Sequence, residues 1–284
     1  MSDGSATLLL AATRIRAAKG RAVVVKLGGS AMEVAAATSG MLDAVAALHT
    51  LGVKLILVHG GGKPIDRAMD AAGLKPVKIQ GLRYTDDETL GIVVRVLHEI
   101  NAGLVSEFES ERDIDVEGVL NGISGTRLML PGIDLQPVYL GRVGKVTGID
   151  GKRFRENLDG PSLSIVPSLA LDESGAWLNV NADSVAAGIA REIETESVLF
   201  LTDIPGILKD RTDPDSRCRR LTVAECRTMI ADGLIDGGMI PKVEACFEAL
   251  EAGAARAVIL DGRDIHSLLD DFLQPGSTGT EIVK

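Results

Sequence analysis

Residues 22–30 read AVVVKLGGS, and residues 53–62 read VKLILVHGGG. In both segments an apolar run typical of a buried strand passes directly into a cluster of glycines. A glycine-rich turn at the carboxyl end of a strand exposes backbone N–H groups that can hold anionic oxygens. The two segments therefore predict two anion-binding turns.

A third segment, residues 237–242, reads GGMIPK and adds a second glycine-flanked lysine. Lys26 and Lys242 lie far apart in the sequence. Together they would supply the positive charge that a transferring phosphoryl group requires. The combination of the three segments indicates phosphoryl transfer as the reaction class.

Strand-like and helix-like segments alternate along the chain, which predicts an α/β fold, a three-layer αβα sandwich around a mainly parallel open sheet. We expect residues 140–146 to form a hairpin or a bend between edge strands. The domain organisation that we expect is an N-terminal helix at 1–20, an N-lobe at 21–195 and a C-lobe at 196–284.

The composition is typical of a soluble globular protein, with 284 residues, 45% of them hydrophobic and 25% charged. A net charge of −10 and 3% aromatic residues argue against a nucleic-acid partner. No apolar run reaches the roughly 18 residues that cross a bilayer, so no membrane partner is expected. Three cysteines without metal or disulfide spacing indicate a reduced, cytoplasmic protein.

Three familiar uses of glycine clusters do not fit this sequence. Pro64 stands where a Walker loop has the Ser or Thr that holds magnesium. Neither cluster contains G-x-G-x-x-G, which weakens the case for a dinucleotide fold, and the chain has no G-x-S-x-G nucleophile elbow. The clusters therefore belong to another kind of site.

The order of six segments is similar to that of the motifs in the amino-acid kinase family. These segments are 26–29 (KLGG), 59–62 (HGGG), 81–86 (GLRYTD), 179–183 (NVNAD), 201–208 (LTDIPGIL) and 238–242 (GMIPK). The resemblance implies the amino-acid kinase fold, in which the N-lobe at 21–195 would bind the amino-acid substrate and make the dimer contacts and the C-lobe at 196–284 would bind ATP. Within the family it points to transfer of the γ-phosphoryl group of ATP to the γ-carboxylate of N-acetyl-L-glutamate. The product, N-acetyl-L-glutamyl 5-phosphate, belongs to arginine biosynthesis.

The resemblance assigns Lys26, Lys242 and Asp183 to catalysis. The lysines would stabilise the transferring group and the leaving β–γ bridge, and Asp183 would hydrogen-bond to both of them. A role for Asp183 at a helix N-terminus is compatible with this. No general base is required, because the acceptor carboxylate is already ionised near pH 7. We expect His59 to be structural.

Substrate binding is assigned by the same resemblance to Gly61, Gly62, Arg83 and Asn179. The glycines would offer N–H groups, the guanidinium would pair with a substrate carboxylate, and the Asn amide would bind the acetamido or α-carboxyl end. ATP binding is assigned to Gly28, Gly29, Thr202, Asp203, Gly206 and Leu208. Mg²⁺ is expected to arrive with ATP, with no dedicated metal site in the protein.

Two alternatives stay open at this point: a carrier-protein-linked aminoadipate kinase, which Tyr84 favours, and a non-catalytic amino-acid sensor on the same fold. The resemblance also implies a homodimer, or a hexamer built as a trimer of dimers through the N-terminal helix, and a PII-type regulator. Arginine-sensitive relatives have a tyrosine near the position of Arg14 and a glutamate at that of Asp271, so feedback inhibition by arginine stays open.

Overall fold

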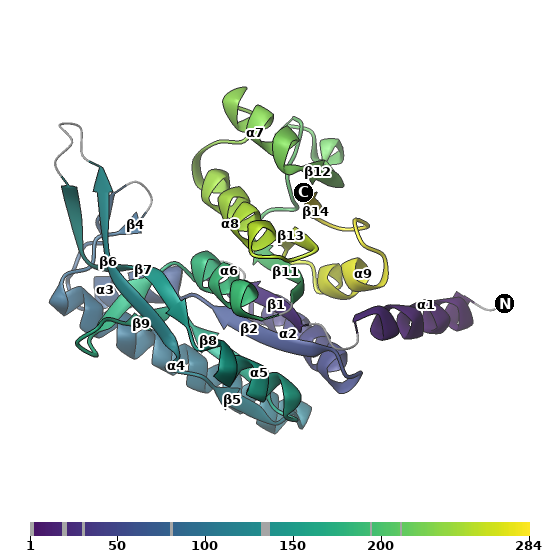
Figure 1. The fold of residues 1–284 in the computed structure, drawn as a ribbon, viewed down its shortest axis with the longest axis horizontal. Coiled ribbons are helices and arrows are strands. Elements are labelled where there is room, and N and C mark those ends of the chain that lie inside the picture. Colours follow the sequence, from purple (N-terminus) through teal and green to yellow (C-terminus); the bar gives the residue numbers. More distant parts are fainter. Residues whose placement is uncertain are drawn as a thin grey trace.

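An eight-stranded sheet forms the centre of the molecule (Figure 1). The structure, a computed structural model, describes residues 3–18, 22–29, 32–79, 82–131, 137–193, 195–210 and 212–284. Ser30 and Gly81, which belong to two of the sequence motifs, lie outside these ranges.

The sheet has the strand order β12-β14-β13-β11-β1-β2-β8-β5. Its strands are β1 (Ala22–Leu27), β2 (Lys54–His59), β5 (Val116–Gly118), β8 (Leu163–Pro167), β11 (Thr195–Thr202), β12 (Arg220–Thr222), β13 (Arg256–Asp261) and β14 (Thr280–Val283). Neighbouring strands are parallel, except that β13 and β14 run antiparallel. The predicted mainly parallel sheet is confirmed.

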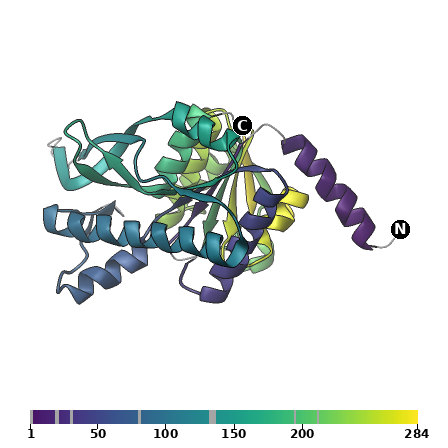
Figure 2. The same ribbon diagram turned by 90° about the horizontal axis from the view of Figure 1, so that it is seen from below.

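Helices cover both faces of the sheet, as Figures 1 and 2 show together. One hydrophobic cluster joins the sheet to α2 (Ala35–Thr50), α4 (Asp87–Arg112) and α9 (Ser267–Leu273). The other joins it to α5 (Gly151–Asp159), α6 (Ala182–Glu192), α7 (Val223–Ala231) and α8 (Ile240–Glu251). Val23 and Val25 of β1 belong to the cluster that contains α2, α4 and α9, whereas Val24 belongs to the cluster that contains α5 to α8. Because β1 is buried on both faces, its sequence is continuously apolar rather than alternating.

Helix α4 is the one helix, among the residues described, that is long and apolar enough to pass a test for a membrane span. Its residues Val93, Leu97, Leu104 and Phe108 are buried in the hydrophobic clusters under the sheet and against α3 (Gly62–Ala71). Packing in the core accounts for its apolar face, as in soluble α/β proteins.

A second sheet lies beside the first and closes into a small barrel in the order β10-β7-β6-β9. Its strands are β6 (Ile123–Pro131), β7 (Pro137–Ile149), β9 (Leu169–Leu171) and β10 (Trp177–Val180). Of the two alternatives for residues 140–146, the structure has the bend, because β7 continues through Gly141, whose φ is 70°. A two-stranded antiparallel ribbon, β3 (Lys78–Ile79) and β4 (Leu82–Arg83), completes this region.

Helix α1 (Asp3–Ala18) projects from the body beside α9 (Figures 1 and 2). Arg14 Nε donates a hydrogen bond to Leu273 O at 3.0 Å. The division into two lobes near residue 195 stays a prediction. The sheet itself runs on across that position, since β11 pairs directly with β1.

The register of the three central strands fixes where the glycine-rich turns lie. Leu27, near the end of β1, is opposite His59 of β2 and Leu201 of β11. Three parallel strands therefore end at the same level, and the segments after them leave the sheet at one edge. This is also where the strand order reverses direction, the place at which open α/β sheets bind ligands.

His59 is completely buried at the end of β2. Its Nδ1 lies 3.2 Å from Gly60 O, and its Nε2 lies 3.2 Å from Nδ2 of Asn101, which also donates to Ile165 O at 3.0 Å. Because an amide nitrogen donates, Nε2 accepts and the ring is neutral, with its proton on Nδ1. Burial lowers the pKa of His59 to about 4. This is the environment of a structural histidine.

The low pKa of His59 predicts a loss of stability in mild acid. The unfolded chain, with an ordinary histidine pKa of about 6.5, binds the proton before the folded chain does. The contribution of His59 to the free energy of unfolding is therefore fully present above about pH 6.5 and is lost as the pH falls toward 4. Between pH 7.5 and 5.0 the free energy of unfolding in urea should fall by about 2 kcal/mol through this residue.

His59→Gln, which cannot titrate, should show a correspondingly shallower dependence of the unfolding free energy on pH. His266→Gln, at an exposed histidine, is the matched control and should keep the wild-type slope. An unchanged slope in His59→Gln would contradict the assignment.

Candidate active site

The two glycine-rich turns that follow β1 and β2 touch each other. A Cβ atom placed on Gly29 would lie only 2.8 Å from the backbone nitrogen of Gly62, closer than real Cβ contacts allow. Beside them, Gly28 N–H donates to Leu201 O at 3.1 Å and Gly60 N–H donates to Leu27 O at 3.3 Å. Gly28 and Gly60 thus fasten the turns to the sheet, and the close approach requires glycine at position 29.

Three helices begin around one cavity of about 370 Å³. Helix α3 begins at Gly62, α6 at Ala182 and α8 at Ile240, and the residues Gly62, Ala182 and Lys242 all line this cavity. The N–H groups of a first helical turn have no partner within the helix, and the helix dipole makes this end positive. Their convergence favours anionic ligands in the cavity.

Lys26 and Asp183 form a buried ion pair on the wall of the cavity. Lys26 Nζ lies 2.7 Å from Asp183 Oδ1, and each side chain is 10% exposed. Lys26 comes from the central strand β1, while Asp183 lies in the first turn of α6, where Asn181 caps the helix by accepting from Asp183 N at 2.8 Å. The structure thus brings together two of the three residues predicted for catalysis.

Lys242 lines the same cavity but does not join this pair. Its Nζ instead donates to Gly238 O at 3.2 Å, in the short 3₁₀ helix Gly237–Met239 that precedes α8. In this structure Asp183 pairs with Lys26, and the binding of Asp183 to both lysines stays a prediction. Lys242 lies near the start of α8, which is separate from the strand and the helix that carry the pair.

Arg83 and Asn179 also line this cavity, and substrate binding by them stays a prediction. The Arg83 side chain is 9% exposed; it pairs with Asp66 of α3 and donates to Gly62 O at 3.0 Å. Asn179 Nδ2 donates to Thr85 Oγ1 at 3.1 Å. Gly61 and Gly62 line the cavity beside them. A Cβ on Gly62 would meet open space, whereas one on Gly61 would lie 2.9 Å from Leu97 Cδ2.

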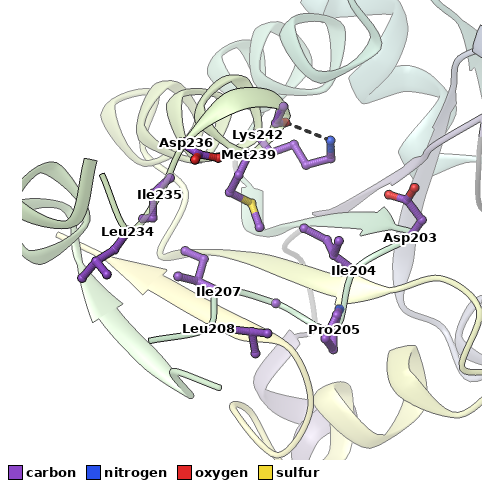
Figure 3. Close-up of a pocket in the computed structure, with 12 residues that line it drawn as sticks. Asp203, Ile204, Pro205, Ile207, Leu208, Leu234, Ile235, Asp236, Met239 and Lys242 are labelled. Atoms are coloured by element: carbon purple, nitrogen blue, oxygen red, sulfur yellow. Dashed lines mark hydrogen bonds between the residues drawn. The ribbon is translucent and has the colours of Figure 1, made fainter. Parts of the chain in front are cut away.

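A second cavity, of about 510 Å³, opens on the other side of Lys242 (Figure 3). One wall is the segment after β11, residues 203–208, which includes the predicted Asp203, Gly206 and Leu208. The facing wall consists of residues that precede α8: Met239, which belongs to the GMIPK motif, and Leu234, Ile235 and Asp236, which no sequence motif marked. The lining suits a partly apolar ligand with anionic groups near Lys242.

Gly206 is required by the backbone of this second cavity. Its φ is 127°, and a Cβ there would lie 2.6 Å from Thr280 Oγ1. The Thr280 hydroxyl accepts from Ile207 N at 2.8 Å and donates to Cys218 O at 2.6 Å. The C-terminal strand thereby fixes the cavity wall, a tertiary contact that the sequence did not reveal.

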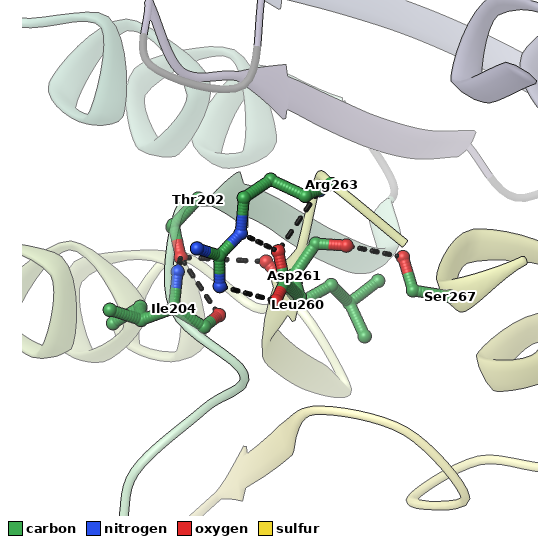
Figure 4. A network of polar contacts seen from close by, with 6 residues as sticks. All are labelled: Thr202, Ile204, Leu260, Asp261, Arg263 and Ser267. Carbon is green, nitrogen blue, oxygen red and sulfur yellow. Dashed lines mark hydrogen bonds and ion pairs between the residues drawn. The ribbon is translucent and has the colours of Figure 1, made fainter. Parts of the chain in front are cut away.

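Thr202 and Gly28 line neither of the two cavities. Thr202 is buried, and its Oγ1 lies 3.2 Å from Ile204 N, 3.3 Å from Ile204 O and 3.5 Å from Leu260 O (Figure 4). Arg263, nearby in Figure 4, is held by both oxygens of Asp261 at 2.8 and 2.9 Å. Both residues thus make backbone contacts at the ends of β11 and β1, and direct ATP contacts by either of them stay a prediction.

No group of three or more His, Cys, Asp or Glu side chains within the described ranges is placed to hold a metal ion. Asp203 and Asp236 are the carboxylates that line the second cavity, and Asp183 lines the first. A metal ion at this site would therefore depend on ligands that a bound substrate supplies.

Residues 21–261 match the amino acid kinase family. The acetylglutamate kinase of Akkermansia muciniphila is 38% identical over 279 residues, covering 95% of this chain and 92% of the relative. The acetylglutamate kinase of Methanosphaera stadtmanae is 37% identical, with 99% and 97% covered. That of Acaryochloris marina is 34% identical, with 99% and 98% covered.

Solved structures share the fold. N-acetylglutamate synthase from Neisseria gonorrhoeae, complexed with coenzyme A and L-arginine, superposes with a TM-score of 0.86 at 24% identity. The alignment covers 99% of this chain but only 65% of that longer protein. Carbamate kinase from Giardia lamblia bound to AMP-PNP gives a TM-score of 0.66 at 16% identity, covering 94% and 99%. These likenesses confirm the predicted fold class.

The buried ion pair generates a stability prediction. Lys26→Met leaves Asp183 charged and unpaired in the interior, which should lower the free energy of unfolding by about 3–5 kcal/mol. Replacing both partners, in Lys26→Met/Asp183→Leu, should recover most of that loss. Urea unfolding measures both variants.

Lys63→Met is the matched control for this experiment. It breaks the ion pair with Glu33 at 2.6 Å, in which the lysine side chain is 57% exposed, and should cost less than about 1 kcal/mol. Equal losses of unfolding free energy in Lys26→Met and Lys63→Met would contradict the inference that burial makes the Lys26–Asp183 pair matter more for stability than an exposed pair.

Proposed function

This chain belongs to the amino acid kinase family, and we propose that it phosphorylates the γ-carboxylate of N-acetyl-L-glutamate with ATP. The product would be N-acetyl-L-glutamyl 5-phosphate, an intermediate of arginine biosynthesis. Relatives named acetylglutamate kinase, at 34–38% identity over nearly the whole chain, support the substrate. The structural observation that carries the proposal is that two cavities meet at Lys242, with the Lys26–Asp183 pair on the wall of one of them.

In this proposal ATP occupies the cavity of about 510 Å³ and the amino-acid substrate the cavity of about 370 Å³. Attack by a carboxylate on the γ-phosphoryl group brings two anions together, so the protein must supply cations and N–H donors where charge develops. Lys26 would face the transferring group from the sheet side, with Asp183 holding its ammonium in place. The first turns of α3 and α6 would add partial positive charge.

Lys242 would stabilise the leaving β–γ bridge. Its Nζ now bonds to Gly238 O, an exposed and replaceable partner at 3.2 Å. A bound polyphosphate offers a stronger, charged partner. We therefore infer that Lys242 turns inward when ATP binds, a change that would couple nucleotide binding to completion of the site.

Arg83 and Asn179 would hold the far end of the acceptor, its α-carboxylate and acetamido group. Asp66 and Gly62 O occupy part of the Arg83 guanidinium, which has five N–H donors, and the remaining donors can serve a carboxylate. Mg²⁺ would enter with ATP and neutralise charge on the β- and γ-phosphate oxygens. It would be held by those oxygens and by water, with Asp203 and Asp236 at the cavity wall.

The comparisons support neither alternative raised by the sequence. The curated relatives compared here carry the acetylglutamate kinase name, not that of an aminoadipate kinase. A non-catalytic sensor has no use for a buried lysine and a second lysine shared between two cavities. We propose a cytoplasmic biosynthetic enzyme.

Helix α1 is the feature that supports assembly into a homodimer or a hexamer. Leu8 and Leu9 are 70% and 59% exposed on this projecting helix, and burial against another subunit would remove them from water. A PII-type regulator stays a proposal without a supporting contact. At the C-terminal segment, Asp271 is buried and bonds Arg256 Nη2 at 2.5 Å, so that carboxylate is already engaged and is a poor candidate for binding free arginine.

The assignment predicts hydroxamate formation specific for one acceptor. ADP release should be measured with N-acetylglutamate, glutamate, aspartate and UMP side by side, with hydroxylamine present to trap any acyl phosphate. Hydroxamate should form with N-acetylglutamate and not with glutamate or aspartate. No turnover with any of the four, alongside measurable amino-acid binding, would overturn the proposal in favour of the sensor.

Lys242→Ala should separate binding from chemistry. Because the lysine would act on charge that develops in the transition state, its loss should lower kcat by about 100–1,000-fold or more. Binding of N-acetylglutamate, measured by calorimetry, should change little. Lys209→Ala, at an exposed loop lysine, is the control and should keep wild-type activity. A Lys242→Ala enzyme with near-normal kcat would contradict the role.

A further inference from the structure

Thr85 is completely buried between the two residues that line the acceptor end of the cavity. Its Oγ1 donates to Arg83 O at 2.9 Å and accepts from Asn179 Nδ2 at 3.1 Å. We propose that Thr85 is a positioning residue for acceptor binding, which fixes the backbone of Arg83 and the amide orientation of Asn179 through one hydroxyl group. The proposal rests on the proposed function, since it concerns the acceptor end of the same site.

The Thr85 hydroxyl has a single proton to donate, and this determines how the Asn179 amide is oriented. A threonine hydroxyl has one proton and two lone pairs. Its proton goes to Arg83 O, so only a lone pair remains for Asn179, and the amide must present Nδ2 to it. Reversing the amide would set two oxygens against each other in a buried place, which is unfavourable. Oδ1 and the second N–H of Asn179 are thereby left for a ligand.

The backbone of Thr85 is itself held on both sides. Thr85 N–H donates to Leu140 O at 3.2 Å, and Arg142 N–H donates to Thr85 O at 2.6 Å, so the residue forms a bridge with the bend in β7. At that bend a Cβ on Gly141 would lie 2.1 Å from Thr85 O. Only glycine fits, which explains the φ of 70° at Gly141 and ties the acceptor site to the small barrel.

The next residue anchors Thr85 from the other direction. Asp86 caps α4 by accepting from Thr89 N at 2.8 Å. Thr85 therefore sits between strand β7 of the barrel and the start of α4 and is bonded to that strand. Such support from rigid elements is what keeps binding groups in a productive geometry.

Thr85 lines neither of the two cavities, so it would act on the substrate only through its neighbours. The proposal therefore predicts a different effect on the KM for the acceptor than on the KM for ATP. Loss of the hydroxyl should weaken binding of the acceptor, which Arg83 and Asn179 hold, and leave ATP binding unchanged. A residue that served only to stabilise the fold would lower the melting temperature or the fraction of active enzyme without such selectivity.

Thr85→Val keeps the size and shape of the side chain and removes the hydroxyl, whereas Thr85→Ser keeps the hydroxyl. For Thr85→Val the KM for N-acetylglutamate should rise about tenfold or more, while the KM for ATP stays within about twofold. Thr85→Ser should remain within about threefold of the wild type in both values. Full-length enzyme is used throughout. Should Thr85→Val not accumulate as folded protein, Thr85→Cys takes its place under the same criteria.

A double-mutant cycle with Asn179→Ala tests whether Thr85 acts through Asn179. If it does, adding Thr85→Val to Asn179→Ala should raise the acceptor KM far less than it does in the wild type. Additive effects, or an unchanged acceptor KM in Thr85→Val, would overturn the proposal.

The wild-type enzyme separates this proposal from the assignment of function. Absence of hydroxamate with the wild type would mean that the proposed function has failed. Normal wild-type turnover combined with a Thr85→Val enzyme of unchanged acceptor KM would mean that only the positioning role has failed.

Discussion

The rest of the site depends on the buried ion pair between Lys26 and Asp183, 2.7 Å apart. Removing two charges from water costs several kcal/mol for each ion, and their attraction alone need not offset this. Two features of the fold help: Asp183 lies in the positive first turn of α6, and Lys26 projects from a strand held on both sides. The fold thus keeps a cation at a position where an apolar pair should recover most of the stability. In the proposed function, that cation would face the transferring group.

Strand β1 lies between β2 and β11, and the turns that follow these two strands line different cavities. On the β2 side the chain turns through Gly60–Gly62, which line the smaller cavity, into α3. On the β11 side it turns through residues 203–208, which form a wall of the larger cavity. Both turns leave the sheet at one level because the parallel register aligns Leu27 with His59 and Leu201. The walls of the two cavities therefore begin at the ends of the two strands that flank β1.

Lys242 comes from a separate helix and lines both cavities, yet its Nζ donates to Gly238 O, just before that helix. The buried carboxylate of Asp183 pairs with Lys26. The fold thus fixes Lys26 and Asp183 together, whereas a backbone contact holds Lys242 apart from them.

The alternation of elements, the buried strands and the glycine-rich turns could be predicted from the sequence, because hydrophobic periodicity and glycine clusters are local signals. The resemblance of its motifs also pointed to a set of candidate residues that all line the smaller cavity: Lys26, Asp183, Lys242, Arg83 and Asn179. Which of these residues touch one another depends on tertiary packing. Thr202 and Gly28 carry motif positions and make backbone contacts, and Thr85, Gly141 and Thr280 contact partners about 55 to 95 positions away in the chain. Such contacts depend on register and packing between distant segments, which no local pattern encodes.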